Sequence, residues 1–183
     1  LFPYTTLFRS LPLSSAQTII SKTLDHAATH KFKALGVVVL DARGSVVAAA
    51  IQDGSSLARF DVAKAKANGA ISMNMGSRGI EKLAKDRPHF LAGALGVIDG
   101  IIPVPGGVLI KSAEGQILGA VGVSGDTSDN DEAAALAGIA AAGLVGDGGQ
   151  GLTPSTTYEW RIKTICSDDS LGSSVYSPVQ YFT

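Results

Sequence analysis

The chain has 183 residues, which is enough for one ordinary domain and a short appendage. Its 15 basic and 16 acidic residues give a formal net charge of -1, so no basic surplus is available to bind the backbone of a nucleic acid. No stretch approaches the roughly 20 consecutive apolar residues that a membrane-spanning helix needs, so we expect a soluble, cytoplasmic protein. The single cysteine, Cys166, excludes an intrachain disulfide and a zinc site built from several cysteines.

The two ends of the chain differ from its centre. Residues 1–10 lack the basic start and the cleavage site of a signal peptide and resemble a translated sequencing adapter, so we expect a non-native head. Residues 145–151 are rich in glycine, which predicts a linker. Residues 152–183 include two short stretches with strand periodicity and resemble the last two strands of a fibronectin type III module. We therefore predict a β fragment after the linker.

The central unit, 11–144, begins with a predicted helix. Ser14 and Gln17 have the spacing of a capping box, and apolar residues follow at helical intervals. The next two apolar runs, 37–40 and 46–51, are separated by a turn sequence that contains aspartate and glycine. This pattern predicts a β-hairpin.

The second half of the central unit repeats the same types of element. Helical spacing of small apolar residues predicts a helix over 57–75, and a further helix is predicted over 78–85 before a glycine-dotted loop. The runs 108–110 and 117–123 predict a second hairpin, and an alanine-rich helix is predicted over 127–144.

These elements define the predicted fold class, which is α/β. Their order is α-β-β-α-α-β-β-α, and a further strand is considered near 101–104. Hairpins that follow one another pair in antiparallel fashion, so we expect one antiparallel sheet with helices on one or both faces.

The polar segment before the last helix is the first candidate site. It places Asp126 and Thr127 where a strand passes into a helix, a position that often binds anions through free amides. Several carboxylates follow directly and would repel an anion, and the glycine and glutamate of a calcium loop are missing. We expect Thr127 or Ser128 to cap the helix, with a ligand-facing loop as the alternative.

His26 and His30 form a second candidate, because residues four apart share one face of a helix as two metal ligands do. The sequence between them lacks the glutamate of a metalloprotease motif. A solvated helix edge is therefore the favoured interpretation.

The third candidate combines Arg87, His89 and Phe90 with the paired glycines Gly106 and Gly107. An imidazole can ligate haem iron, an aromatic ring can pack on the macrocycle, and a guanidinium can pair with a propionate. The glycines would allow a close approach of the backbone to a ligand. The alternative is that His89 and Arg87 tie the loop to the fold through hydrogen bonds.

Taken in order, four stretches of the central unit resemble the GlcG/HbpS family of small bacterial haem-binding proteins. The similarity covers about 13–144 and implies a profilin-like fold, a five-stranded antiparallel sheet flanked by helices, with assembly into a homo-oligomer. The resembling stretches are 63–67, 86–90, 102–110 and 119–127.

The resemblance implies that the chain binds haem or a related tetrapyrrole, with a role in haem handling or degradation. We take His89 as the candidate iron ligand, and the resembling stretches add Lys66, Asp126 and Thr127 to the candidate cofactor-binding residues. One alternative is an accessory or small-molecule-converting protein of glycolate or propanediol metabolism, in which Lys66 and the loop after Asp126 face a hydroxy acid or aldehyde. The other is an oligomeric assembly module without a cofactor.

Overall fold

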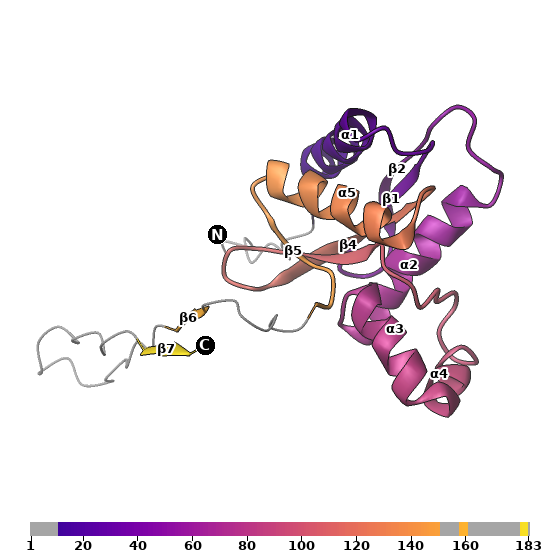
Figure 1. Cartoon of the computed structure of the whole chain (residues 1–183), viewed down its shortest axis with the longest axis vertical. Helices are drawn as coiled ribbons and strands as arrows, with labels where there is room; N and C mark the ends of the chain where they lie inside the picture. The colour runs from indigo at the N-terminus through magenta and orange to yellow at the C-terminus, as the bar shows by residue number, and fades with distance from the viewer. Residues whose placement is uncertain (1–10, 151–157, 161–179, 183) are drawn as a thin grey trace, which may run out of the picture. The chain divides into compact units, whose positions relative to one another are not determined.

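The computed structural model describes residues 11–150, 158–160 and 180–182. The chain divides into two compact units, one that ends at Gln150 and one that begins at Gly151. Figure 1 shows the elements of the first unit. In chain order they are α1 (Leu13–Thr29), β1 (Gly36–Asp41), β2 (Val46–Ile51), α2 (Arg59–Met73), α3 (Ser77–Asp86), α4 (Pro88–Ala94), β3 (Gly107–Lys111), β4 (Ile117–Ser124), α5 (Ser128–Ala141) and β5 (Val145–Asp147).

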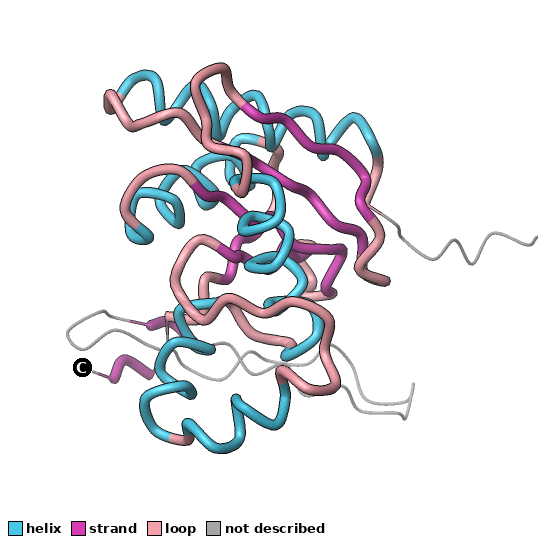
Figure 2. The backbone as a smooth tube through the Cα atoms, turned by 90° about the vertical axis from the view of Figure 1, so that its right-hand side faces the viewer, coloured by secondary structure: helices cyan, strands magenta, loops and turns pink. Residues whose placement is uncertain are grey.

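Within residues 11–150, five strands form one antiparallel sheet in the order β2-β1-β4-β3-β5. The three central strands are buried along almost their whole length, because helices lie on both faces of the sheet (Figure 2). A strand buried on both faces needs apolar residues at every position. This explains why the central strands have continuous apolar sequences instead of alternating ones.

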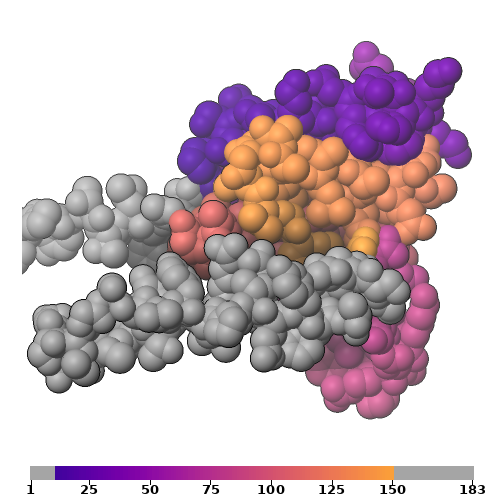
Figure 3. Space-filling model, turned by 60° about the vertical axis from the view of Figure 1, so that its left-hand side comes forward, coloured from indigo at the N-terminus to yellow at the C-terminus, as the bar shows by residue number. Residues whose placement is uncertain are grey.

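Successive strand residues face different helix layers. Val37 and Val39 belong to the core that packs against α1 and α5, whereas Val38 and Leu40 belong to the core beneath α2. In Figure 3 the indigo surface that includes α1 lies directly against the orange surface of α5, and both helices pack on the same core at one face of the sheet. The fold therefore has three layers, with the sheet in the middle.

Helix α2 approaches the sheet closely because both surfaces carry small residues. Ala63, Ala67 and Ala70 are its buried alanines. A Cβ atom added to Gly122 of β4 would clash with the backbone carbonyl oxygen of Ala63. Glycine at this position of the strand is therefore a requirement of helix-sheet packing.

Helices α3 and α4 build a smaller cluster beyond the end of α2. Its buried apolar residues are Ile80 of α3, Leu91 of α4 and Ile101 of the loop that follows. Among the described elements, α4 contacts only α3 (Figure 1). The side of α4 that carries His89 and Phe90 is exposed to solvent.

The structure confirms the α/β fold with a five-stranded antiparallel sheet and both predicted hairpins. The fifth strand, however, is not near residues 101–104. Val145–Asp147, placed in the predicted glycine-rich linker, instead pair with β3 as an edge strand. The glycine within it, Gly146, lies against the side chains of Leu136 and Ile139.

Helix termini also differ from the predictions. Helix α1 is capped by Pro12, and Ser14 lies inside the first turn, so the predicted capping box does not form. The helix predicted over 78–85 corresponds to α3. An additional helix, α4, begins at Pro88, whose missing N–H costs nothing in the first turn. At α5 the predicted cap is confirmed, since the side chain of Thr127 accepts a hydrogen bond from the Asn130 amide at 3.3 Å.

The second unit is described only at strands β6 (Tyr158–Trp160) and β7 (Gln180–Phe182), which pair in antiparallel fashion. Both fall within the stretches predicted as strands. The predicted head at 1–10 and Cys166 lie outside the described residues.

Candidate functional site

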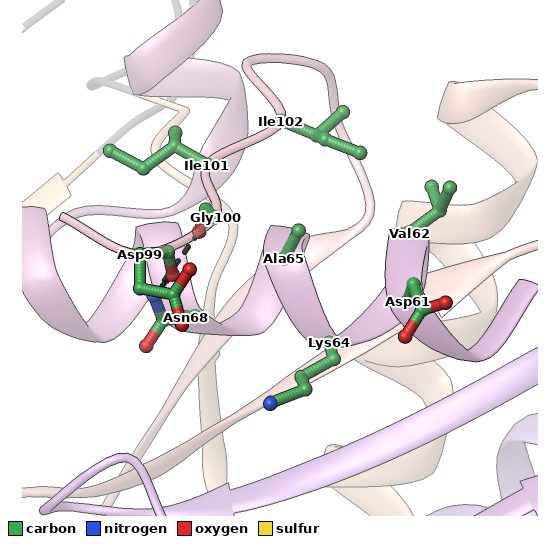
Figure 4. A pocket seen from close by; sticks show the side chains of 9 residues that line it. All are labelled: Asp61, Val62, Lys64, Ala65, Asn68, Asp99, Gly100, Ile101 and Ile102. Atoms are coloured by element: carbon green, nitrogen blue, oxygen red, sulfur yellow. Dashed lines mark hydrogen bonds between the residues drawn. The ribbon is translucent and has the colours of Figure 1, made fainter. Parts of the chain in front are cut away.

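Two hollows flank the solvent-facing side of α2. The first, about 370 Å³ in volume, lies between α2 and the loop 99–102. In Figure 4, Val62 and Ala65 rise from α2 toward the part of the loop that carries Ile102. A second hollow, also of about 370 Å³, shares the wall formed by Lys64, Asn68 and Asp99. Both are as large as small-molecule sites commonly are.

Asn68 holds the loop that forms this wall. Its side-chain amide donates hydrogen bonds to the backbone carbonyls of Asp99, at 2.5 Å, and Gly100, at 3.1 Å. None of the residues proposed from the sequence lines either hollow. Sequence reasoning missed the hollows because their two walls lie about thirty residues apart in the chain and share no motif.

The sequence-predicted residues around His89 lie together at α4. Arg87 immediately precedes the helix, and its guanidinium carbon lies 5.0 Å from the centroid of the Phe90 ring. His89 is exposed, and Phe90 is 41% exposed. Within the described residues, Arg87 pairs with no carboxylate, so its charge remains available to a ligand.

Other apolar side chains extend the exposed surface of this region. Leu91 faces inward and anchors α4, whereas Leu95 is 50% exposed and Val97 is 86% exposed. Val97 also lines the second hollow beside α2. Large apolar side chains that remain exposed are candidates for a binding surface.

Lys66, another predicted site residue, is buried in an ion pair. Its ammonium group donates to a carboxylate oxygen of Asp131 at 2.8 Å and to the carbonyl of Val123 at 3.0 Å. The side chains of the pair are 3% and 2% exposed. Burial raises the pKa of Asp131, although Lys66 acts in the opposite direction. No substrate can reach this pair without moving the structure around it.

Gly106 and Gly107 lie against the same lysine. Gly106 has a φ of +115°, and a Cβ atom on it would lie 2.8 Å from the Lys66 ammonium nitrogen. A Cβ atom on Gly107 would clash with the Lys66 carbonyl oxygen, and the Gly107 amide donates to the Ser77 hydroxyl at 2.7 Å. Gly107 thus lies against the α2 backbone, and Gly106 lies beside the buried ion pair of Lys66 and Asp131.

Asp126 organises the loop that precedes α5. Its carboxylate accepts hydrogen bonds from the amides of Lys33, at 2.8 Å, and Thr127, at 2.7 Å, and from the Asn130 side chain. These bonds, led by that from Lys33, lower the pKa of Asp126 to about 2. The structure thus brings Lys66, Gly106 and Gly107 together beside this loop, whereas His89 and its neighbours lie on α4.

A further polar network was not predicted from the sequence. Glu132 of α5 is buried, and one of its carboxylate oxygens accepts from the Arg78 guanidinium at 2.9 and 2.7 Å and from Gln150 at 3.0 Å. The hydrogen bonds to Glu132 and Asp129 raise the pKa of Arg78. The network ties α3, α5 and the segment after β5 together.

The imidazoles of His26 and His30 stack with their centroids 4.0 Å apart. His30 is exposed, as expected for a helix edge, but His26 is partly buried. Burial is the main cause that lowers the pKa of His26, and the charge of His30 acts in the same direction.

In the part of the chain that the structure describes, no group of three or more His, Cys, Asp or Glu side chains surrounds a common point where a metal ion could bind. Among the described helices, none has the length and apolar character needed to cross a membrane.

The fold resembles that of several solved structures. A PduOC–haem complex is 20% identical with a TM-score of 0.66, and the match covers 74% of this chain and 96% of that chain. The Klebsiella pneumoniae protein ORFY is 23% identical with a TM-score of 0.65, covering 78% and 97%. At these identities the two structures show the fold alone. A double mutant of HbpS from Streptomyces reticuli is 26% identical with a TM-score of 0.63, covering 72% and 86%.

Sequence comparison gives the family. No curated protein sequence matches the chain. The family model described as "Haem degrading protein HbpS-like" matches residues 11–140, which span α1 to β4 and all but the last residue of α5. The chain therefore belongs to the HbpS-like family, whose function is related to haem.

Proposed function

We propose that this protein binds haem at α4, with His89 as the axial ligand of the iron, Arg87 as the partner of a propionate and Phe90 against the macrocycle. One observation carries the proposal: a single short helix and the residue before it expose an imidazole, a guanidinium without a carboxylate partner in the described chain, and an aromatic ring. Membership of the HbpS-like family supports the choice of haem as the ligand.

The donor set of the described residues fits haem iron. An imidazole nitrogen is a common axial ligand, and the three histidines of the chain are His26, His30 and His89. His30 uses one ring nitrogen on a backbone carbonyl, whereas His89 makes no polar contact with any described residue. Both nitrogens of His89 are therefore accessible. Haem, when bound, supplies an iron centre for redox chemistry and for binding small ligands.

The surroundings of His89 fit the rest of the ligand. Arg87 can form charge-assisted hydrogen bonds with a propionate, which are stronger than neutral ones. Phe90, Leu95 and Val97 offer apolar surface that is otherwise left in water. The role of this chain's residues is thus to hold the ligand, to orient it and to exclude water from one of its faces.

We also propose that the protein assembles into a homo-oligomer through strand β2. This strand lies at the edge of the sheet and contains neither a charged residue nor a proline, and Val46 and Ile51 are 46% and 44% exposed. Natural edge strands usually carry charges, prolines or bulges that prevent pairing with another chain. The pairing of β2 with β1 shifts register once, at Val47, but residues 48–51 pair regularly and carry no such protection. The opposite edge, β5, is protected by being only three residues long.

A titration of the full chain with ferric haem, followed by absorbance in the Soret region, tests the haem proposal. We expect a saturable shift at one haem per chain, lost in His89→Ala and kept in the control His30→Ala. Arg87→Gln should leave the position of the band unchanged and weaken binding about tenfold, the size of a lost charge-assisted hydrogen bond. A shift lost in His30→Ala but kept in His89→Ala would contradict the assignment of the ligand, and the absence of any shift would contradict haem binding.

The hollows beside α2 favour a second candidate function, the binding of a small polar molecule. Lys64 contributes to both hollows and has no carboxylate partner among the described residues. A titration with glycolate followed by nuclear magnetic resonance should shift the amide signals of Lys64 and Asn68, and Lys64→Ala should abolish the shifts. Shifts that persist in Lys64→Ala would contradict this role.

A further inference from the structure

The C-terminal end of α1 carries a ring cluster that the haem proposal does not use. The imidazoles of His26 and His30 stack with their centroids 4.0 Å apart and their planes inclined by 27°. The ring of Phe32 packs against both, with centroid distances of 5.8 Å to His26 and 5.6 Å to His30. The cluster therefore consists of two nitrogen-bearing rings with an apolar ring beside them.

The backbone at the end of α1 brings the three rings together. Lys31 is in the left-handed region, with a φ of 58°. The Phe32 amide donates to the Ala27 carbonyl at 2.9 Å, and the Lys31 amide donates to the Ala28 carbonyl at 3.2 Å. This pair of bonds is the Schellman motif, which normally has glycine at the left-handed position. The turn directs the chain back along the helix and places Phe32 on the histidines.

One hydrogen bond determines which nitrogen of His30 is free. Its Nδ1 atom lies 2.8 Å from the carbonyl oxygen of His26. Because a carbonyl only accepts, Nδ1 must carry the hydrogen in the neutral ring, and Nε2 is left with a free lone pair. Histidines that ligate metals typically donate their other ring N–H to a carbonyl or carboxylate in this way. The tautomer of His30 is thus the one that metal binding requires.

The spacing of the rings suits a shared metal ion. A metal–imidazole bond is about 2.0–2.1 Å long, so two nitrogens on one ion lie at most about 4 Å apart. The two rings stack with their centroids 4.0 Å apart, so their in-plane lone pairs do not converge in this arrangement. Because the residues are four apart on one helix face, rotation of both side chains out of the stack can bring one nitrogen of each ring to a shared ion. The cluster also lies at the end of α1 where the helix dipole favours a cation.

The donor set determines the class of ion. The nearest carboxylate in sequence, that of Asp25, is engaged by Lys22 at 2.9 Å, and within the described chain no third histidine, cysteine or carboxylate joins the pair. Oxygen-seeking ions such as Mg²⁺ and Ca²⁺ are therefore excluded. Imidazole suits Zn²⁺, Ni²⁺ and Cu²⁺, and Cu²⁺ binds most strongly of these. We propose that His26 and His30 chelate one divalent transition-metal ion, preferentially Cu²⁺, with its remaining positions open to water or an external ligand.

Titration of the full chain with Cu²⁺ alone tests the proposal. Calorimetry gives the dissociation constant, and electron paramagnetic resonance reports the nitrogen ligands of the bound ion. We expect one bound ion with two imidazole nitrogens. His26→Gln and His30→Gln should each weaken binding about tenfold or more, because the second nitrogen otherwise binds intramolecularly at a high effective concentration. The matched control, His89→Gln, should leave the affinity and the spectrum unchanged.

Two further measurements keep the result interpretable. Circular dichroism should show that the variants remain folded, and Phe32→Leu, which retains both imidazoles, should keep the two-nitrogen spectrum. An affinity that His30→Gln does not change, a spectrum with only one nitrogen, or an equal loss in His89→Gln would overturn the proposal.

Discussion

The buried charges of Lys66 and Asp131 show how strongly single residues of this fold depend on their partners. Each is almost fully removed from water, and the bond between them is 2.8 Å long. Removing one partner of such a pair leaves an uncompensated charge in a poorly polarisable interior, which costs far more than the intact pair contributes.

We therefore expect Lys66→Met to lower the free energy of unfolding by about 3–5 kcal/mol at neutral pH. Adding Asp131→Asn should recover much of the loss, since the amide is neutral and keeps an oxygen for the Asp126 amide, which donates at 3.0 Å. Urea denaturation of the two variants measures both effects. An equal loss in both variants would contradict the role assigned to the unpaired carboxylate.

The same variant should depend on pH in a defined direction. Burial already raises the pKa of Asp131, and without Lys66 the largest opposing influence is gone. A carboxyl whose pKa is raised by folding favours the protonated form, so its stabilising effect is present at low pH and is lost as pH rises through the folded pKa. The stability difference between Lys66→Met and the unsubstituted chain should thus shrink on acidification from about pH 7 toward the ordinary aspartate pKa of about 3.9. A difference that stays constant in urea denaturation would contradict this.

Lys31 illustrates a local conflict between sequence and backbone. A residue with a Cβ atom in the left-handed region costs roughly 1–2 kcal/mol, and Lys31 has a φ of 58°. Lys31→Gly should therefore raise the free energy of unfolding by about 1 kcal/mol, measured by thermal unfolding. Lys33→Gly, two residues later, is the control and should give no such gain.

At the level of elements, the close contact between α2 and β4 sets the position of the whole helix layer. Because a Cβ atom on Gly122 would clash with the α2 backbone, neither element can move independently of the other. Gly122→Ala should destabilise the protein by about 3 kcal/mol or more, as expected for overpacking that shifts the backbone. The control Gly93→Ala, a helix position with open space around it, should instead stabilise by roughly 0.5–1 kcal/mol. Thermal unfolding of both variants checks the contrast.

The free edge of the sheet gives a second prediction about elements. Ala49 is exposed on β2, and a charge placed on an edge strand opposes pairing with another chain. Light scattering should show an oligomer for the unsubstituted chain and a smaller species for Ala49→Lys. Ala113→Lys, in the exposed turn between β3 and β4, is the matched control and should keep the larger mass. An oligomer that survives Ala49→Lys would contradict assembly through β2.

Elements also explain which parts of the fold were predictable. The hairpins could be predicted because each consists of two apolar runs separated by a turn sequence, all within a few residues of one another. Strand β5 could not, since it has only three residues, one of which is a glycine, and its pairing with β3 depends on a partner far away in the sequence. Helix α4 was missed because a proline that ends one helix can equally begin the next.

At the level of the whole molecule, site residues that lie close together in the sequence could be predicted as a group. Partners that lie far apart in the sequence could not. Arg87 and Phe90 are three residues apart, and their grouping was predicted from sequence. Lys66 was predicted to be a site residue, but its partner Asp131 is 65 positions away, and Glu132 lies 54 positions from Arg78. Sequence spacing identifies neighbours on one helix, whereas such long-range pairs follow from the topology of the sheet.

The position of bound haem on the folded molecule is the most direct test of the central claim. Ferric haem is paramagnetic, so it broadens the nuclear magnetic resonance signals of residues close to the iron. The account predicts that one equivalent of haem removes the signals of His89, Phe90 and their neighbours in α4, while those of His26 in α1 and of His30 directly after it remain. Loss of the α1 signals with α4 unaffected, or an unchanged spectrum, would contradict it.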